Sequence, residues 1–274
     1  EAFGFKTAWV CPTPACRDRQ LAWRMDDIHG NLFYLPNPKQ VELEEAVASK
    51  KYAAICIGGA RGGSKSIGWR RIAQRYCLKL ENFTVLFLRR ELKPLTRNHL
   101  RLAHREADLI GGKFTSMKHS FPETYSEIEY GHCAEKNDWD QYIGAEADLV
   151  IFEQAEQFEE IQFMEIGAAA GRVPREDWRG IVGASENPNG PSSAFVDRLF
   201  VKKNMDRQKF PGYDPNDYFF LYSHLEDNPY VSPDYVKSLA RMGAEKREMY
   251  RYGRRDVFPG QFFKNFHPTE HVTA

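Results

Sequence analysis

The chain has 274 residues, of which 42% are hydrophobic, and its 38 Lys and Arg residues equal its 38 Asp and Glu residues in number. This length allows one large domain, or one domain with an added subdomain, around a sizeable core. Because the formal net charge is zero, the overall charge gives no argument for nucleic-acid binding. No apolar stretch approaches the ~18 residues that span a bilayer. The first residues lack the pattern of a signal peptide.

Residues 1–36 carry no clear periodicity and are predicted to be irregular. The segment 40–50 predicts a helix, because apolar residues and glutamates alternate there at helical spacing. Two near-continuous apolar runs follow at 53–57 and 84–88, and such runs are typical of strands covered on both faces of a parallel sheet. Between these two strands, the sequence predicts a helix over about 65–80.

The second half of the chain repeats this alternation. The segment 97–109 predicts a helix, and 125–130 alternates weakly and predicts a strand. Strands are also predicted at 147–152, 180–183 and 218–223, and a helical region at 233–252 precedes an extended tail at 257–263. Strands that alternate with helices predict an α/β fold with a central, mostly parallel sheet flanked by helices.

The chain has five cysteines. Their odd number, together with the position of Cys56 inside a predicted strand, favours reduced thiols in a cytosolic setting. Cys11 and Cys16 are spaced too widely for a C-x-x-C metal knuckle, and no second pair accompanies them. We therefore expect no zinc site.

A glycine-rich loop follows the first predicted strand. Residues 58–66 read Gly-Gly-Ala-Arg-Gly-Gly-Ser-Lys-Ser and precede a predicted helix, which is the order of a nucleotide-phosphate cradle. Glycines let backbone N–H groups turn onto phosphate oxygens, and the helix N-terminus adds partial positive charge. Lys65 would contact the β- and γ-phosphates, and the Ser66 hydroxyl would ligate Mg²⁺. The predicted nucleotide-binding residues of this loop are Gly59, Ala60, Arg61, Gly62, Gly63, Ser64, Lys65 and Ser66.

One position departs from the usual G-x-x-x-x-G-K-[ST] pattern. When the pattern is aligned on Lys65, its first glycine is Gly59, but Ser64 stands where the second glycine is usual. Serine fits there only if the backbone φ is acceptable without glycine. The alternative interpretation is a glycine-rich connection with a solvated lysine. The flanking strand and helix favour the phosphate cradle, and they predict a P-loop NTPase.

The strand predicted at 147–152 supplies the partner that such a loop needs. Its apolar run ends at Glu153, at the edge where open α/β sheets bind ligands, and this carboxylate would hold Mg²⁺ through water. In ATPases of the additional-strand type, a catalytic glutamate comes next and polarises the attacking water. Here the next residue is Gln154. The alternative is a strand end without chemical function.

Gln154 has two interpretations, because an amide hydrogen-bonds water but cannot accept its proton. The chain is either a hydrolysis-deficient variant, in which Gln replaces Glu and bound ATP is trapped, or Gln154 orients the water as some NTPase glutamines do. We favour the first interpretation. The predicted catalytic residues are Gln154, Arg61 and Lys65, and the predicted metal ligands are Ser66 and Glu153.

Four polar residues complete the predicted site. Gln40, upstream of the loop, is placed to recognise adenine, or it is an ordinary polar residue at a helix start. Arg61 would lie over the γ-phosphate as a finger in cis, or it is a solvated loop arginine. Ser185 and Asn187, after the strand at 180–183, would sense the γ-phosphate, or they form a turn built on Asn-Pro.

Together these motifs resemble the large terminase subunit of tailed bacteriophages, the ATP-driven motor that packages DNA into procapsids. The resemblance rests on the loop at 58–66, on Phe-Glu-Gln-Ala-Glu-Gln-Phe at 152–158, on the coupling-like motif at 185–190, and on the segment 225–260. It implies a P-loop ATPase fold of the additional-strand type with a small C-terminal lid. The implied domains are an ATPase core at 1–205, a lid subdomain at 206–258, and a linker at 259–274 toward a nuclease domain that the sequence does not contain.

The resemblance implies a motor that binds ATP and Mg²⁺ and couples hydrolysis to the translocation of double-stranded DNA. The implied partners are that DNA, the portal ring, the small terminase subunit and further copies of the chain in a ring, with no membrane, in the cytoplasm of the infected bacterial host. Two departures from the family matter. Gln154 implies disabled hydrolysis, and the nuclease carboxylates of the family do not follow, so we expect no nuclease activity.

Two alternatives remain, namely another P-loop translocase related to helicases, and a nucleotide-gated assembly module that binds ATP without turnover. The surface that contacts DNA also has two interpretations. A basic stretch at 89–105 would either contact DNA phosphates, with salt-dependent binding, or form a solvated helix face, which the sequence alone slightly favours. Its members are Arg89, Arg90, Lys93, Arg97, Arg101 and Arg105.

Overall fold

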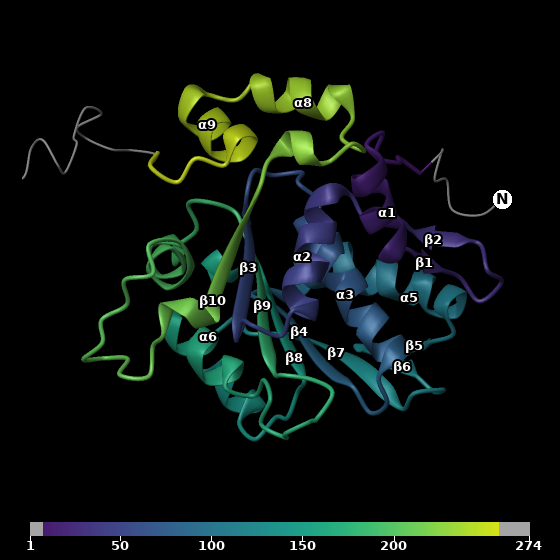
Figure 1. The fold of residues 1–274 in the computed structure, drawn as a ribbon. Coiled ribbons are helices and arrows are strands. Elements are labelled where there is room, and N and C mark those ends of the chain that lie inside the picture. The colour runs from purple at the N-terminus through teal and green to yellow at the C-terminus, as the bar shows by residue number, and fades with distance from the viewer. Residues whose placement is uncertain (1–7, 258–274) are drawn as a thin grey trace, which may run out of the picture.

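The computed structural model describes residues 8–257 (Figure 1). Its strands in the main sheet are β3 (Ala54–Gly59), β4 (Thr84–Arg89), β5 (Lys113–Thr115), β6 (Lys118–Phe121), β7 (Ser126–His132), β8 (Leu149–Glu153), β9 (Ile181–Glu186) and β10 (Tyr218–Ser223). The spatial order is β10-β3-β9-β8-β4-β7-β6-β5. All pairings from β10 to β7 are parallel, whereas β6 and β5 extend the far edge with antiparallel pairings.

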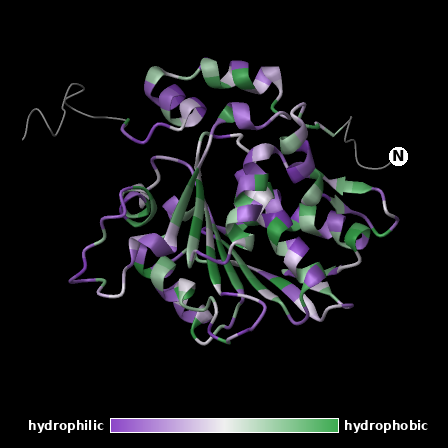
Figure 2. Cartoon of the chain, viewed as in Figure 1, coloured by the Kyte–Doolittle hydropathy of each residue, from purple (hydrophilic) through white to green (hydrophobic). Residues whose placement is uncertain are grey.

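Helices cover both faces of this sheet (Figure 1). One face carries α2 (Pro38–Ala48), α3 (Lys65–Lys79) and α5 (Arg101–Ala107), with α1 (Pro14–Ala22) packed on α2, and the other face carries α6 (Glu160–Gly167) and α7 (Ser193–Val196). Trp69 is buried against the first face, and Phe163 and Phe200 are buried against the second. Because both faces are covered, β3 and β8 consist entirely of buried residues, and the strands are predominantly hydrophobic in Figure 2.

The strand order confirms the predicted fold class. β9 lies between β3, which leads into the glycine-rich loop, and β8, which ends at Glu153. This inserted strand is the additional strand of the predicted ATPase type. Since β3, β9, β8 and β4 are all parallel, their carboxyl ends meet at one edge of the sheet, where open α/β folds bind ligands.

Several elements differ from the sequence prediction. Residues 1–36 are not irregular throughout, because their described part contains α1 and a ribbon of β1 (Met25–Asp26) and β2 (Leu32–Tyr34). These elements and the unpredicted α6 are too short for a periodic pattern to stand out. The helix predicted at 97–109 begins earlier, as α4 (Leu92–Leu95), and passes through a π-helical turn at Thr96–Leu100 before α5.

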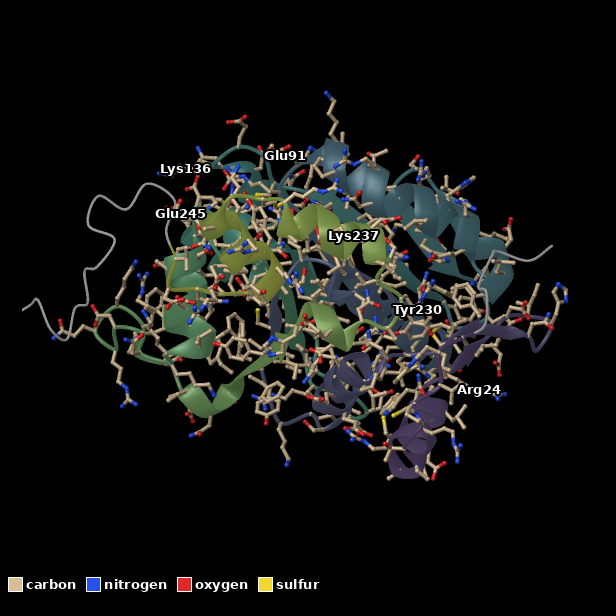
Figure 3. The ribbon with its side chains drawn as sticks, turned by 90° about the horizontal axis from the view of Figure 1, so that it is seen from above. Arg24, Glu91, Lys136, Tyr230, Lys237 and Glu245 are labelled. Carbon is tan, nitrogen blue, oxygen red and sulfur yellow. The ribbon has the colours of Figure 1, made fainter. Side chains whose placement is uncertain are left out.

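The segment after β10 forms a lid over the carboxyl edge of the sheet (Figure 1; Figure 3 looks down on it). Its helices are α8 (Pro233–Ala240) and α9 (Ala244–Tyr252). A small apolar core joins Leu225 and Leu239 of the lid to Ala60 of the glycine-rich loop. β10 itself belongs to the main sheet, so the core extends beyond residue 205, where the sequence placed its end.

Three further observations concern the chain as a whole. All five cysteines lie in the described part, and each is a free thiol. Among residues 8–257, no helix is both long enough and apolar enough to span a membrane. The linker predicted at 259–274, and the predicted extended tail beyond Val257, lie outside the described residues.

Hydrogen bonds and close packing against its main chain hold the glycine-rich loop to the lid. The Arg61 N–H donates to the Tyr250 carbonyl at 2.8 Å, and Asn228 Nδ2 donates to the Gly62 carbonyl at 2.6 Å. Gly253, which ends α9, also packs on this loop. The loop is therefore held between the sheet below it and the lid above it.

We expect Gly253→Ala to destabilise the protein. Gly253 has a φ of +67°, and a Cβ there would lie 2.7 Å from the Ala60 nitrogen and 3.0 Å from Gly59 Cα. The strain of roughly 1–3 kcal/mol should lower the thermal unfolding midpoint by about 3–10 °C, as measured by scanning calorimetry. Gly243→Ala is the matched control, because Gly243 has a φ of −54° and open space around it. Equal midpoints for the two variants would contradict the close packing at Gly253.

Candidate nucleotide-binding site

Strand register brings polar side chains together at the carboxyl edge of the sheet. Arg89 is the partner of Glu153 across β4 and β8, and Glu153 is the partner of Ser185 across β8 and β9. Partners in adjacent strands lie about one strand spacing apart, roughly 4.8 Å. Three residues that are distant in the sequence therefore end side by side. Lys65 and Ser66 begin α3 at the same edge, since β3 leads directly into their loop.

The glycine-rich loop holds its lysine inward. Lys65 Nζ donates to the carbonyls of Gly59, at 3.3 Å, and Ala60, and the residue is only 6% exposed. Burial lowers the pKa of Lys65 to about 8, although the carboxylates of Glu186 and Glu156 oppose this shift. A negatively charged ligand beside this ammonium would favour its protonated form.

Ser64, at the position of the second glycine of the usual pattern, adopts a left-handed conformation that glycine takes up without strain. Its φ is +57° and its ψ is 22°, in the left-handed region that serine disfavours. Its hydroxyl donates to the Gly63 carbonyl and accepts from Asn37 Nδ2, both at 2.7 Å. Its own carbonyl accepts from Gln40 Nε2 at 3.1 Å. Hydrogen bonds from the start of α2 therefore compensate for the missing glycine.

Gln40 belongs to the capping box that begins α2. Asn37 Oδ1 accepts from the Gln40 N–H, and Gln40 Oε1 accepts from the Asn37 N–H, each at 2.9 Å. Both ends of the Gln40 amide are therefore engaged, one in the cap and one on Ser64. Gln40 lies beside the loop and serves as the polar residue at a helix start, and a contact with adenine would require one of these bonds to be exchanged.

Glu153 is a buried carboxylate that stays ionised. Its Oε1 accepts from the Ser66 hydroxyl at 2.6 Å, and its Oε2 lies 2.8 Å from Arg89 Nη1. Burial by itself would raise the pKa of Glu153, but His99, the Arg89 guanidinium and the Ser66 hydroxyl together lower it to about 2. Ser66 and Glu153 thus offer two adjacent hard oxygen atoms, the ligands that Mg²⁺ prefers.

Gln154 faces the same cavity from the end of β8. Its φ of +62° is in the left-handed region, and its N–H donates to Ser185 Oγ at 3.2 Å. Its Oε1 accepts from Arg89 Nη2 at 2.5 Å. Arg89 therefore binds Glu153 and Gln154 at once, and it holds the Gln154 amide in place beside the predicted metal ligand.

The polar residues of this edge line a cavity of about 580 Å³. Its lining includes most of the predicted site, namely residues 61–66, Glu153, Gln154, Ser185 and Asn187. Gly59 and Ala60 belong to the same loop but do not line this cavity, and their carbonyls accept hydrogen bonds from Lys65 instead. Arg61 stacks its guanidinium on Tyr250 of the lid, 3.5 Å from the ring centroid. The structure thus brings the predicted residues together, with Arg61 engaged by the lid.

A second and more apolar cavity of about 260 Å³ adjoins the first. The two cavities share Ser64, Ile67 and Asn228 in their linings. This cavity was not predictable from the sequence, because its walls combine the stretch predicted to be irregular with the lid. The apolar and aromatic walls are formed by Leu32, Phe33, Tyr34, Leu35 and Tyr230.

Glu156, three residues after Glu153, lies outside the cavity lining. It is buried, at 2% exposure, and a Cβ on Gly190 would collide with its side chain. Burial and the neighbouring Glu186 raise the pKa of Glu156 to about 8. Glu186 is paired with Arg255, which also binds Asp197. This buried cluster connects the segment after α9 to the end of β9.

The sequence did not predict several residues of the cavity lining, Arg89, Asn98 and His99 among them. Arg89 was assigned to a stretch that contacts DNA or solvent, and this was wrong, because it is 7% exposed and paired with Glu153. Its position directly after a buried strand was a usable signal. Asn98 and His99 also line the cavity, and His99 Nε2 lies 3.8 Å from Glu153 Oε2. No sequence motif marks these two residues.

Comparison with solved structures finds the same fold. The large terminase of a thermophilic bacteriophage matches with a TM-score of 0.62 and 15% identity, over 86% of this chain and 58% of its own. The large terminase of the same phage in complex with ADP matches with a TM-score of 0.60 and 15% identity, over 86% of this chain and 57% of its own. The large terminase of bacteriophage HK97 matches with a TM-score of 0.60 and 14% identity, over 88% of this chain and 55% of its own. The chain therefore has the α/β fold of these large terminases.

The chain spans between 55% and 58% of the length of these three structures. No family model matches the sequence, and no curated protein matches it. At 14–15% identity the likeness establishes the fold.

Proposed function

We propose that this chain is the motor domain of a large terminase subunit, an ATPase that packages viral double-stranded DNA into a procapsid. The observation that carries the proposal is the convergence of Lys65, Ser66, Glu153 and Gln154 on one cavity, in a fold shared with phage large terminases. ADP is bound to one of those terminases. In this chain the site lacks the base for hydrolysis, because Gln154 stands at the catalytic position.

The two adjoining cavities suit the two ends of ATP. The polar cavity has Lys65 and the N-terminus of α3, which favour the triphosphate through charge and backbone N–H groups. The apolar cavity suits the flat, largely apolar adenine ring. Gln40 lines the apolar cavity beside Ser64, which belongs to both. The site therefore has a place for each part of the nucleotide along one continuous surface.

Mg²⁺ would be held by the Ser66 hydroxyl and Glu153, and it would supply charge neutralisation at the β- and γ-phosphates. The pKa of Glu153 near 2 keeps this carboxylate ionised at neutral pH, as a metal ligand has to be. In the described part of the chain, no group of three or more His, Cys, Asp and Glu side chains could hold a metal. This suits an ion whose other ligands are phosphates and water.

The γ-phosphate end of the cavity would be read by Gln154, Ser185 and Asn187, which line it together. The Gln154 amide can hydrogen-bond an attacking water but cannot take its proton, so the chemical step lacks general-base assistance. Arg61 would reach the γ-phosphate as a finger in cis only after leaving the Tyr250 ring. This exchange would make the position of the lid sensitive to the bound nucleotide.

The partners that we propose follow from the terminase assignment. They are double-stranded DNA, the portal ring, the small terminase subunit and further copies of this chain in a ring, in the cytoplasm of the infected bacterial host. Their support is the likeness to phage large terminases, of which the chain spans about three-fifths or less. We propose no nuclease activity for residues 1–274.

A second candidate function is a nucleotide-gated assembly module that binds ATP without turnover. The observation that favours it is the Arg89 guanidinium, which binds both Glu153 and Gln154. The Gln154 amide is therefore held in place, and residue 154 presents no proton acceptor to the cavity. Such a module would use the same two cavities for binding. It differs from a motor in having no turnover to couple to DNA.

Two measurements on the intact chain separate these functions. For a motor, double-stranded DNA should stimulate ATP turnover in the Gln154→Glu form by at least about tenfold, a factor that corresponds to ~1.4 kcal/mol. For an assembly module, Mg·ATP should change the sedimentation coefficient of the unaltered chain, while neither form turns ATP over. We expect the first result. Turnover in the Gln154→Glu form that is indifferent to DNA would contradict the motor function.

A further inference from the structure

The segment from α4 to α5 carries two series of residues, each spaced by four positions. The buried series is Leu95, His99, Ala103 and Ala107. The exposed series, which we call the basic stripe, is Lys93, Arg97, Arg101 and Arg105. Each member of the basic stripe lies two positions before a buried residue, which is about 200° around a helix. The two series therefore occupy opposite sides of the segment.

Three cations of the basic stripe lack an acidic partner within the chain. Lys93, Arg97 and Arg101 take part in none of the ion pairs formed among residues 8–257, and Arg97 Nε donates only to the amide of Asn98, at 3.4 Å. Like charges four residues apart on a helix repel one another. These three charges therefore destabilise their own helix unless an anion outside the chain neutralises them.

The stretch at 89–105 thus divides into two parts with different surroundings. Arg89 is paired with Glu153, and Arg90 lies 3.8 Å from a carboxylate oxygen of Glu159. Past Glu91, which precedes α4, the cations are exposed. In this second part, Lys93, Arg97 and Arg101 are accessible to another molecule.

We propose that the basic stripe binds the phosphate backbone of double-stranded DNA; this deepens the proposed motor function and rests on it. From Lys93 to Arg105 the helix rises ~18 Å, at ~1.5 Å per residue. One DNA strand carries a phosphate every ~3.4 Å along the axis, or about five over that length. A row of regularly spaced cations matches the regular charge of a nucleic-acid backbone better than the scattered acids of a protein surface.

The same helical segment also contacts the nucleotide cavity. Asn98, His99 and Leu102 line that cavity, and His99 faces Glu153. The π-helical turn at Thr96–Leu100 contains both Arg97 of the stripe and the two cavity residues Asn98 and His99, and such turns are frequent at functional sites. DNA on the stripe and nucleotide in the cavity would therefore contact the same turn from different sides.

The test replaces three cations at once, as Lys93→Gln, Arg97→Gln and Arg101→Gln. The matched control has Lys51→Gln, Arg207→Gln and Arg241→Gln, which remove the same charges from exposed positions on other elements. Fluorescence anisotropy of a labelled duplex is measured over a series of salt concentrations. We expect the slope of log K against log[salt] to become shallower by about 2–3 in the stripe variant, and to remain unchanged in the control.

An unchanged slope in the stripe variant would overturn the proposal. So would unchanged DNA binding combined with lost self-association, which would make the stripe an interface between copies of the chain. Binding of a fluorescent ATP analogue, measured in parallel, separates this proposal from the proposed function. If the stripe variant binds the nucleotide and its slope of log K against log[salt] is unchanged, the proposed function is retained but DNA binding by the basic stripe is refuted. Single variants Arg97→Gln and Arg101→Gln, each expected to reduce the slope by about one, replace the triple variant if it does not fold.

Discussion

Gln154→Glu should raise ATP turnover by about 10²–10⁴-fold and leave the affinity for ATP nearly unchanged. Residue 154 already faces the cavity beside Glu153 and Ser185, so a carboxylate of the same shape would lie in the same place. The Arg89 guanidinium, which now bonds to Gln154 Oε1, would keep that carboxylate ionised. An ionised carboxylate can accept the proton of an attacking water. The rate factor corresponds to about 3–5 kcal/mol of transition-state stabilisation.

Steady-state turnover of both forms tests this prediction, with double-stranded DNA and assembly partners present. Gln157→Glu is the control, because it makes the same chemical change three residues further on, outside the lining of the cavity. Equal turnover for the parent and Gln154→Glu would mean that residue 154 is not at the position of the base. Since Glu156 is buried away from the cavity, Glu153 would then be the next carboxylate to test.

Lys65→Ala should lower the affinity for Mg·ATP by at least about a hundredfold. Lys65 is the cation held inside the glycine-rich loop, on the Gly59 and Ala60 carbonyls. Each charge-assisted hydrogen bond to a phosphate contributes about 1.5–3 kcal/mol, and two of them account for a factor of a hundred or more. Alanine cannot replace these bonds, and it also removes the positive charge that the triphosphate attracts.

Titration with a fluorescent ATP analogue measures this loss. Lys79→Ala is the matched control, because it removes a lysine from the other end of α3, where the side chain is exposed and far from the loop in sequence. Equal affinities for Lys65→Ala and the unaltered chain would show that the loop at 58–66 is not the phosphate cradle. That result would also contradict the proposed function.

The strand, the glycine-rich loop and the helix of the proposed phosphate cradle could be predicted from the sequence, because they are adjacent in the chain. The apolar residues of β3, the glycine-rich loop and the start of α3 follow one another without interruption. Local rules apply to such a segment, namely buried strand, turn and helix start. The same holds for β8 and the carboxylate of Glu153, which ends it. The strand–loop–helix order was therefore predictable to within a few residues.

The capping box at Asn37 and Gln40 makes a tertiary contact that the local sequence does not predict. Its sequence signals a helix start, but nothing in it shows that the Gln40 amide would also bond to Ser64. That contact depends on how α2 and α3 pack together. It explains how serine tolerates the left-handed conformation that the usual pattern reserves for glycine.

The sequence by itself determined the alternation of strands and helices, the glycine-rich loop and the carboxylate at the end of a buried strand. Only the tertiary structure decided that Arg89 and Ser185 flank Glu153, because strand register joins residues from separate parts of the chain. It also decided that the lid closes over the loop, through Tyr250 and Gly253. Hydrophobic periodicity reports which side of an element is buried, but it does not say which element covers it.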